Sequence, residues 1–304
     1  MHPEPAVIPE IPEPVTLSLN AMATRFELVL YGSDPSRLRA AGEEALQEIE
    51  SLEAQLSFYR ADSEISFLNH NAARGPVKVE PRLFRLLQDC LHLSALTEGA
   101  FDITVGPLMR AWRFVNGQGG VPDTGDREFA TSVVGSRYVE LDEASHTVRF
   151  RKPGVEIDLG AYGKGYAIER AVSLLKENGV ASSLIHGGTS SVYAIGTPPR
   201  RRFWRVPIAQ PAAYERSQLD LDLVDRGLSV SAIHGKFFEQ GGDRYGHVID
   251  PRSGQAVRGS LTAVVEGPSP TVCEALSTAL LVLGDSWLPT MAEVFEGYRG
   301  WVSQ

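Results

Sequence analysis

Residues 158–169 read DLGAYGKGYAIE, a glycine-rich turn between an extended segment and a helical one. A predicted short strand at 155–159 leads into it, and Ile168, Val172 and Leu175 then fall on one face of a helix. Glycines let the backbone approach a ligand closely, and the free N–H groups of a helix start favour an anion such as phosphate. The spacing matches neither the dinucleotide-binding motif nor the P-loop. Two interpretations stay open at this point: phosphate binding, or a tight strand-to-helix turn that needs glycine only for packing.

The elements around this turn indicate an α+β fold. Apolar spacing over 35–55 and 81–96 predicts two amphipathic helices, and further helices are expected from Pro270 and from about Leu288. The stretches at 56–69 and 99–108 look non-helical, and loops are expected at 115–126 and 196–201. Strands and helices are interspersed without a strict βαβ rhythm, which favours α+β over a doubly wound sheet. Strands are predicted within 16–31 and at 137–141, 146–151, 155–159, 183–195, 203–209, 217–223, 227–231, 246–249 and 261–266.

Composition excludes some classes of function. The 304 residues include 29 Lys and Arg against 38 Asp and Glu, a formal net charge of −9. Because nucleic acid binding needs a basic face, we expect no nucleic acid partner. No stretch approaches the roughly 18 consecutive apolar residues of a membrane span, so no membrane-spanning segment is expected.

The proline-rich start of the chain is expected to be a flexible tail over residues 1–14, followed by one composite domain over 15–304. It lacks the basic and apolar segments of a secretory signal, so the chain as given is predicted to be cytoplasmic. An export signal trimmed from the sequence is the alternative. Cys90 and Cys273 lie far apart in helix-like segments and are predicted to be reduced core thiols.

Two further motifs are less specific. Gly187 and Gly188 follow His186, and such a pair marks the close approach of either a neighbouring strand or a ligand. The chain has no G-x-S-x-G motif, so a serine hydrolase is not expected. In the stretch 245–254, YGHVIDPRSG, His247 is a candidate general base or a hydrogen-bonded structural residue. Asp250 begins a turn.

The segment SPTVCEALSTALL at 269–281 places acidic and hydroxyl side chains in an apolar helix. Ser269 is a good N-cap and Pro270 a good first helical residue. Glu274 and Thr278 are four residues apart and project from the same face. A carboxylate in so apolar a helix must lie at an edge, be paired, or bind a cation. Oxygen ligands of this kind suit Mg²⁺ or Ca²⁺ far better than zinc.

Aromatic side chains near these motifs leave two possibilities. Phe58, Tyr59 and Phe101 can stack on a planar ligand, or they can fill the core.

Taken in order, these segments resemble the ApbE family, the FAD:protein FMN transferases that attach FMN covalently to a threonine of a partner protein. The resemblance runs from about Ser18 to Gly284. No single piece is diagnostic, but six or seven in order over most of the chain are hard to obtain by chance. The matching pieces are Met22-Ala-Thr24, LSFYRADSEISFLN, GAFDITVGPLMRAW, DLGAYGKGYAIE, Gly187-Gly188, Ser231, HVIDPRSG and EALSTALLVLG.

This resemblance implies a fold and a set of site residues. It implies a T-fold-like α+β architecture of mixed or antiparallel sheets with packed helices, in two lobes around a central cleft that holds FAD. It implies that Mg²⁺ is bound by Glu274, Thr278 and the backbone carbonyl of Gly163, and that His247 helps to deprotonate the incoming threonine. The cofactor-binding positions it implies are Met22, Tyr59, Phe101, Asp102, Lys164, Gly165, Gly187, Gly188, Ser231 and Asp250.

The resemblance also implies the reaction: a Thr or Ser hydroxyl of an acceptor flavoprotein attacks the FMN phosphorus of FAD, and AMP leaves. The chain departs from the family pattern at Ala23, Gly163, His186, Thr189, Ala232 and Glu274. Glu274 stands where the family has Asp, so it keeps the charge but reaches one methylene further. Two alternatives are therefore carried forward. One is hydrolysis of FAD to FMN and AMP, and the other is a non-catalytic relative that binds a flavin or nucleotide or assists cofactor assembly.

Overall fold

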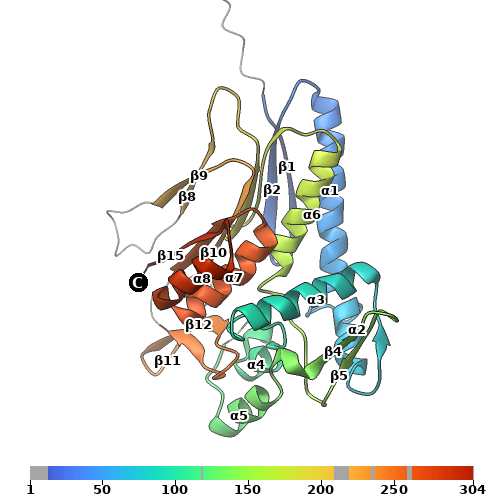
Figure 1. Cartoon of the computed structure of the whole chain (residues 1–304), viewed down its shortest axis with the longest axis vertical. Helices are drawn as coiled ribbons and strands as arrows, with labels where there is room; N and C mark the ends of the chain where they lie inside the picture. The colour runs from blue at the N-terminus through green and yellow to red at the C-terminus, as the bar shows by residue number, and fades with distance from the viewer. Residues whose placement is uncertain (1–12, 118, 209–218, 234–236, 259–261, 304) are drawn as a thin grey trace, which may run out of the picture.

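The computed structural model describes residues 13–117, 119–208, 219–233, 237–258 and 262–303 (Figure 1). The predicted proline-rich tail, residues 1–14, lies outside these ranges except for its last two positions.

A seven-stranded antiparallel sheet is the largest element of the structure. Along its order, each strand pairs antiparallel with the next. Alternation along the second strand buries Phe26, Leu28 and Leu30, each 0% exposed, on the face toward the helices. The strands, in sheet order, are β1 (Val15–Ala21), β2 (Thr24–Tyr31), β6 (Ser182–Gly187), β7 (Ser191–Ile195), β10 (Arg226–Ala232), β14 (Thr262–Gly267) and β15 (Arg299–Ser303).

Three helices pack against this sheet: α1 (Pro35–Leu56), α6 (Gly163–Glu177) and α7 (Pro270–Leu283). α1 contacts β1 and α6, α6 contacts α7, and α7 contacts β10 and β14. The expected N-terminal cap of α7 is confirmed, because the Ser269 hydroxyl accepts a hydrogen bond from the Val272 N–H at 3.2 Å. The row of helices in Figure 1 thus presents the N-terminus of α6 to the side of α7.

The remaining elements lie mostly beyond one end of this layer, in the lower half of Figure 1. Three-residue 3₁₀ helices cover Phe114–Asn116, Ser136–Tyr138 and Asp285–Trp287. The helices are α2 (Glu64–Asn71), α3 (Pro81–Leu96), α4 (Gly106–Ala111), α5 (Thr124–Ser132) and α8 (Leu288–Val294). The smaller sheets contain β3 (Val77–Lys78), β5 (Thr147–Phe150) and β4 (Val139–Asp142); β11 (Phe237–Gln240), β12 (Asp243–Ile249) and β13 (Ala256–Arg258); and β8 (Trp204–Ile208) with β9 (Leu219–Leu223).

The α+β prediction is confirmed, and four local predictions are wrong. Within 56–69, residues from Glu64 form helix α2, which Ser63 caps by accepting from the Ser66 N–H at 3.0 Å. Helix α4 likewise begins inside 99–108, and α5 begins inside the loop expected at 115–126. The strand predicted at 155–159 is not formed: Val155, Ile157 and Leu159 are buried in the core, and within the described ranges the segment makes one isolated bridge, between Val105 and Glu156. The three helices are too short to show a clear apolar period, and the alternating apolar residues of 155–159 fill the core without pairing in a sheet.

The two cysteines are buried and free, as predicted. Among the described residues, no individual helix combines the length and apolarity of a membrane span. The segments Pro270–Leu283 and Asp285–Val294 pass that test only as a pair, with a bend of 120° between them.

The turn between β1 and β2 holds two non-glycine residues in a left-handed conformation. Ala21 pairs with Thr24, so the turn has two central residues, and Met22 (φ 49°) and Ala23 (φ 57°) both lie in the region that favours glycine.

We predict that Ala23→Gly stabilises the protein by about 1 kcal/mol, because the left-handed backbone costs alanine roughly 1–2 kcal/mol while glycine adds entropy to the unfolded chain. Urea unfolding followed by circular dichroism measures the change. Ala40→Gly on the exposed face of α1 is the matched control and should cost roughly 1 kcal/mol. A loss of stability in Ala23→Gly would contradict the strain assigned to this turn.

Candidate functional site

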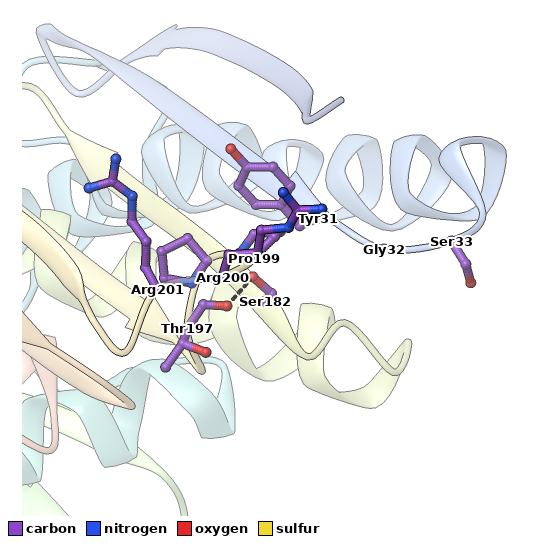
Figure 2. Close-up of a pocket in the computed structure, with 9 residues that line it drawn as sticks. Tyr31, Gly32, Ser33, Ser182, Thr197, Pro199, Arg200 and Arg201 are labelled. Atoms are coloured by element: carbon purple, nitrogen blue, oxygen red, sulfur yellow. Dashed lines mark hydrogen bonds between the residues drawn. The ribbon is translucent and has the colours of Figure 1, made fainter. Parts of the chain in front are cut away.

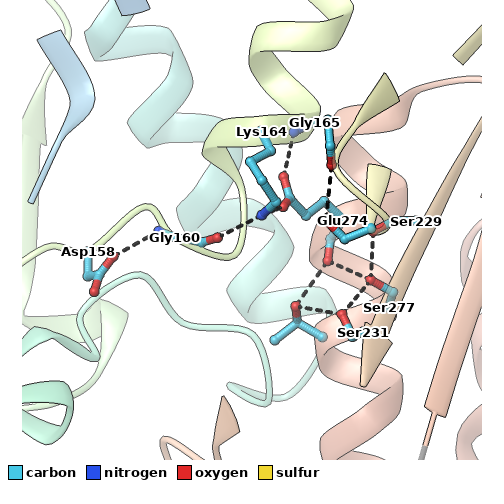
Figure 3. A network of polar contacts seen from close by, with 11 residues as sticks. Asp158, Gly160, Lys164, Gly165, Ser229, Ser231, Glu274 and Ser277 are labelled. Atoms are coloured by element: carbon cyan, nitrogen blue, oxygen red, sulfur yellow. Dashed lines mark hydrogen bonds and ion pairs between the residues drawn. The ribbon is translucent and has the colours of Figure 1, made fainter. Parts of the chain in front are cut away.

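The site is built where the first turn of α6 meets the side of α7. Gly165 makes this approach possible, because a Cβ there would lie 2.5 Å from the carbonyl oxygen of Pro270 and 2.9 Å from the Cα of Thr271. Glu274 on α7 is only 3% exposed, yet both of its oxygens have partners on α6. Lys164 Nζ forms an ion pair with Oε1, and the Gly165 N–H donates to Oε2 (Figure 3). The buried carboxylate is therefore paired, one of the three outcomes expected from the sequence.

Hydroxyl groups continue from Glu274 along the next turn of α7 toward the sheet. Thr278 Oγ1 donates to the Glu274 carbonyl oxygen at 3.1 Å and lies 3.4 Å from Ser231 Oγ on β10. Ser231 is also 2.8 Å from Ser277 Oγ, which donates to Ser229 Oγ at 3.1 Å (Figure 3). Because the Thr278 proton is used on the helix carbonyl, the lone pairs of its oxygen are left to face a donor or a cation.

The predicted metal ligands are hard oxygen donors. Glu274 supplies one carboxylate, Thr278 a hydroxyl oxygen and Gly163, the first residue of α6, a backbone carbonyl. Across the described ranges there is no cluster of three or more His, Cys, Asp or Glu side chains that could enclose a metal by themselves. Mg²⁺ is commonly held by one or two carboxylates together with substrate phosphates and waters. The donor set therefore fits a cation that shares its coordination with a bound phosphate.

The turn before α6 is closed by its own polar contacts. Asp158 is 6% exposed, and its Oδ1 accepts from the Gly160 N–H at 2.8 Å. Burial raises the pKa of the Asp158 carboxyl above its ordinary value, although the hydrogen bond from Gly160 opposes this. Lys164 Nζ also donates to the Gly160 carbonyl at 3.3 Å. The cationic side chain of the glycine-rich turn is thus committed to protein partners.

The predicted glycine pair lies beside the β1–β2 turn. Gly187 pairs with Phe26, and a Cβ there would lie 2.8 Å from the Phe26 ring. Gly188 has φ +63°, and a Cβ there would lie 2.2 Å from Thr24 Oγ1. The Met22 N–H donates to Glu53 Oε1 at 2.6 Å, which ties this turn to α1. The strand-packing interpretation of the glycine pair is confirmed, and a ligand contact stays a prediction.

Asp102 and Asp250 make a second set of polar contacts. Asp102 is 7% exposed and accepts hydrogen bonds from Thr104, Ser94 and Ser136. A cavity of about 380 Å³ is lined by Asp102 together with Arg252 and Pro251. Asp250 pairs with the Arg252 guanidinium at 2.9 Å. Desolvation opposes ionisation of Asp250, but the hydrogen bonds from Arg252 outweigh it and lower the pKa of that carboxyl.

The three aromatic candidates, Phe58, Tyr59 and Phe101, differ clearly in their exposure to solvent. Phe101 is 1% exposed and packs 6.1 Å from the Tyr162 ring, so it belongs to the core and offers no free face to a ligand. Phe58 is also buried. Tyr59 is 62% exposed, and desolvation and the charge of Asp158 raise the pKa of its hydroxyl. Tyr59 is the one of the three that can still stack on a ligand ring.

His247 is half-buried on β12, and that strand contacts α7, the helix that carries Glu274. The structure thus has the candidate base on a strand that adjoins α7.

A larger cavity, about 510 Å³, lies elsewhere (Figure 2). Tyr31, Ser182, Arg200 and Arg201 line it, and the Ser182 hydroxyl donates to the Thr197 carbonyl at 2.7 Å. Tyr31 ends β2 whereas Thr24 begins it, so by strand geometry this cavity is roughly 20 Å from the glycine pair. None of the predicted site residues lines it.

Sequence reasoning missed three contributors to the site. Ser229 and Ser277 complete the hydroxyl network, and Glu53 holds the Met22 backbone. Ser229 is two residues before Ser231 on the same strand, so the period of two could have indicated it. Ser277 directly precedes Thr278. Nothing in the sequence around Glu53 signals its contact with a turn 31 residues earlier.

Comparison with known proteins gives a consistent result. A sequence profile described as the ApbE family matches residues 22–299. A protein of Klebsiella pneumoniae named FAD:protein FMN transferase is 31% identical over 244 residues, covering 80% of this chain and 74% of the relative. A Salmonella typhimurium protein of the same name is 28% identical and covers 97% of this chain and 91% of its own length.

Solved structures agree with the sequence matches. The ApbE protein of Thermotoga maritima superposes with a TM-score of 0.85 at 25% identity, covering 95% of this chain and 94% of its own. The apo form of the Pseudomonas stutzeri flavinyl transferase ApbE gives a TM-score of 0.80 at 26% identity, with 96% and 95% coverage.

The contact between α6 and α7 predicts opposite effects at two neighbouring glycines. Gly165→Ala should destabilise the protein by about 1–3 kcal/mol, because its Cβ meets the backbone of α7. Gly163→Ala is the matched control: no atom lies within 4 Å of its Cβ, so it should be neutral or stabilising by up to about 1 kcal/mol. Thermal unfolding of the two variants checks this. Equal effects would contradict a close backbone approach at Gly165.

The lowered pKa of Asp250 predicts a pH-dependent contribution to stability. Because the folded pKa is below the unfolded value of about 3.9, the contribution is present above that pH and is lost as the pH falls through the folded pKa. Asp250→Asn should therefore cost about 1 kcal/mol or less at pH 7 and progressively less below about pH 4. Urea unfolding at several pH values measures the difference. Asp285→Asn, at an exposed carboxylate, is the control, and a cost for Asp250→Asn that persists at low pH would refute the assignment.

Proposed function

The chain belongs to the ApbE family, and from that membership we propose that it transfers FMN from FAD to a Thr or Ser hydroxyl of an acceptor protein, with release of AMP. The relatives named FAD:protein FMN transferase support the flavin transfer. The observation that carries the proposal for this chain is the junction of α6 and α7. There, the Glu274 carboxylate meets the Lys164 ammonium and the Gly165 N–H at the N-terminus of α6, and the Thr278 hydroxyl lies one turn further along α7.

A diphosphate is the ligand chemistry that this junction suits. The N-terminus of α6 favours negative charge, and Lys164 adds a cationic group at the same place. Glu274, Thr278 and the Gly163 carbonyl are proposed to hold Mg²⁺ beside the diphosphate. When bound, the ion would neutralise charge on the phosphate oxygens during transfer.

The proposed reaction is an in-line displacement at phosphorus. The acceptor hydroxyl oxygen forms a new bond to the FMN phosphorus, the bond from that phosphorus to the bridging oxygen breaks, and AMP leaves with the bridging oxygen. His247 is proposed to take the hydroxyl proton. Its place on β12, which contacts α7, supports this role.

The other predicted positions are proposed to line the rest of the FAD site. The exposed Tyr59 supplies a ring for stacking, and Met22, Gly187 and Gly188 border the β1–β2 turn. Ser231 orients Thr278 through the hydroxyl network. Asp102, Asp250 and the buried Phe101 support the surrounding structure through their own contacts.

We also propose that residues 15–304 form one composite domain. The main core cluster supports this, because it draws side chains from Val15 through to Phe295. The two-lobed cleft and the cytoplasmic location remain predictions from sequence.

The proposed function is tested by incubating this protein with FAD, Mg²⁺ and a protein substrate of the Salmonella typhimurium relative. We expect flavin fluorescence on the denatured acceptor band with the wild-type protein, and at least 100-fold less with Glu274→Gln, because that variant loses the only carboxylate in the donor set. Glu50→Gln, at an exposed site on α1, is the matched control and should retain the wild-type rate.

The same assay separates the alternatives. AMP release without acceptor and without labelling would indicate an FAD hydrolase. FAD binding with neither product would indicate a non-catalytic relative, and either outcome would contradict the transferase proposal.

A further inference from the structure

The ion pair between Lys164 and Glu274 uses the carboxylate that the proposed function assigns to a metal. The two side chains are 21% and 4% exposed, so this contact is largely shielded from solvent. Glu274 Oε1 faces the Lys164 ammonium, and Oε2 faces the Gly165 N–H (Figure 3). Both oxygens of the carboxylate thus already have a partner on α6, and one of these partners is a cation.

An ammonium and a divalent cation cannot share Glu274 at close range. Two like charges a few ångströms apart repel strongly, and more so where water is largely excluded. A cation that binds Glu274 and Thr278 must therefore displace the Lys164 Nζ. The Gly165 N–H can stay on Oε2, because it is a backbone group fixed in the first turn of α6.

Within the described ranges, the Lys164 ammonium makes no second ion pair. Its other contact is the Gly160 carbonyl at 3.3 Å, a neutral acceptor. The carboxylate of the turn itself, Asp158, is buried and already accepts from the Gly160 N–H. A diphosphate at the N-terminus of α6 would supply the missing negative charge.

We propose that Lys164 is a built-in counter-ion for Glu274 that keeps a divalent cation out until the diphosphate of a nucleotide draws the ammonium away. The inference rests on the proposed function, since it assumes that this site takes a nucleotide diphosphate. Metal and nucleotide then bind as a pair, and each raises the affinity for the other by the same factor.

Binding of Mn²⁺ alone, followed by electron paramagnetic resonance without any nucleotide, tests the inference. We expect Lys164→Met to bind Mn²⁺ at least 10-fold more tightly than the wild-type protein. Lys164→Arg is the matched control, because it keeps a cation beside Glu274 and should stay within about 3-fold of wild type. Equal Mn²⁺ affinity in the wild-type protein and Lys164→Met would overturn the proposal.

A second measurement uses the wild-type protein, so it stands even if Lys164→Met does not fold. FAD should raise the wild-type affinity for Mn²⁺ at least 10-fold, and an unchanged affinity in the presence of bound FAD would overturn the proposal. Failure of the proposed function is distinguishable. If FAD does not bind at all, the transferase proposal fails, while the comparison of wild type with Lys164→Met in Mn²⁺ alone still decides whether Lys164 excludes the cation.

Discussion

A carboxylate buried in an apolar helix is the constraint on which the site depends. Glu274 lies among Ala275, Leu276 and Leu280 on α7, where an unpaired charge would be very unfavourable. The protein meets this need by bringing the N-terminus of α6 against α7. The contact is so close that only glycine fits at position 165. The pairing of the Glu274 carboxylate therefore depends on the close packing of α6 against α7.

The rest of the fold holds this contact in place. The seven-stranded sheet supports both helices, and β10 brings Ser229 and Ser231 to the hydroxyl groups of α7. At the start of α7, Glu169 of α6 accepts hydrogen bonds from the hydroxyls of Ser269 and Thr271. Polar contacts thus join α6 and α7 on both sides of Gly165. Rigid elements of this kind position functional groups more closely than loops do.

Much of this arrangement could be predicted from the sequence, and the reasons differ from residue to residue. The long helices α1 and α7 show a clear apolar period and strong caps, so their starts were predictable. The pairing of Glu274 was expected only as one of three outcomes, because the sequence does not say which distant group meets it. Its partners, Lys164 and Gly165, come from 110 and 109 residues earlier in the chain. Short helices such as α2 and the buried run at 155–159 were mispredicted because local pattern and tertiary burial conflict there.

The family comparison and the physical argument support the same proposal. The relatives carry the names of flavin transferases, and this chain has oxygen donors and an ammonium at the N-terminus of α6, where we propose that a diphosphate and its cation bind. The most direct test is a crystal structure with FAD and Mn²⁺, with the ion located from its anomalous scattering. The account predicts the ion between Glu274 and Thr278 beside the diphosphate, with Lys164 Nζ turned onto a phosphate oxygen. An ion bound elsewhere, or FAD bound while Lys164 still pairs with Glu274, would contradict it.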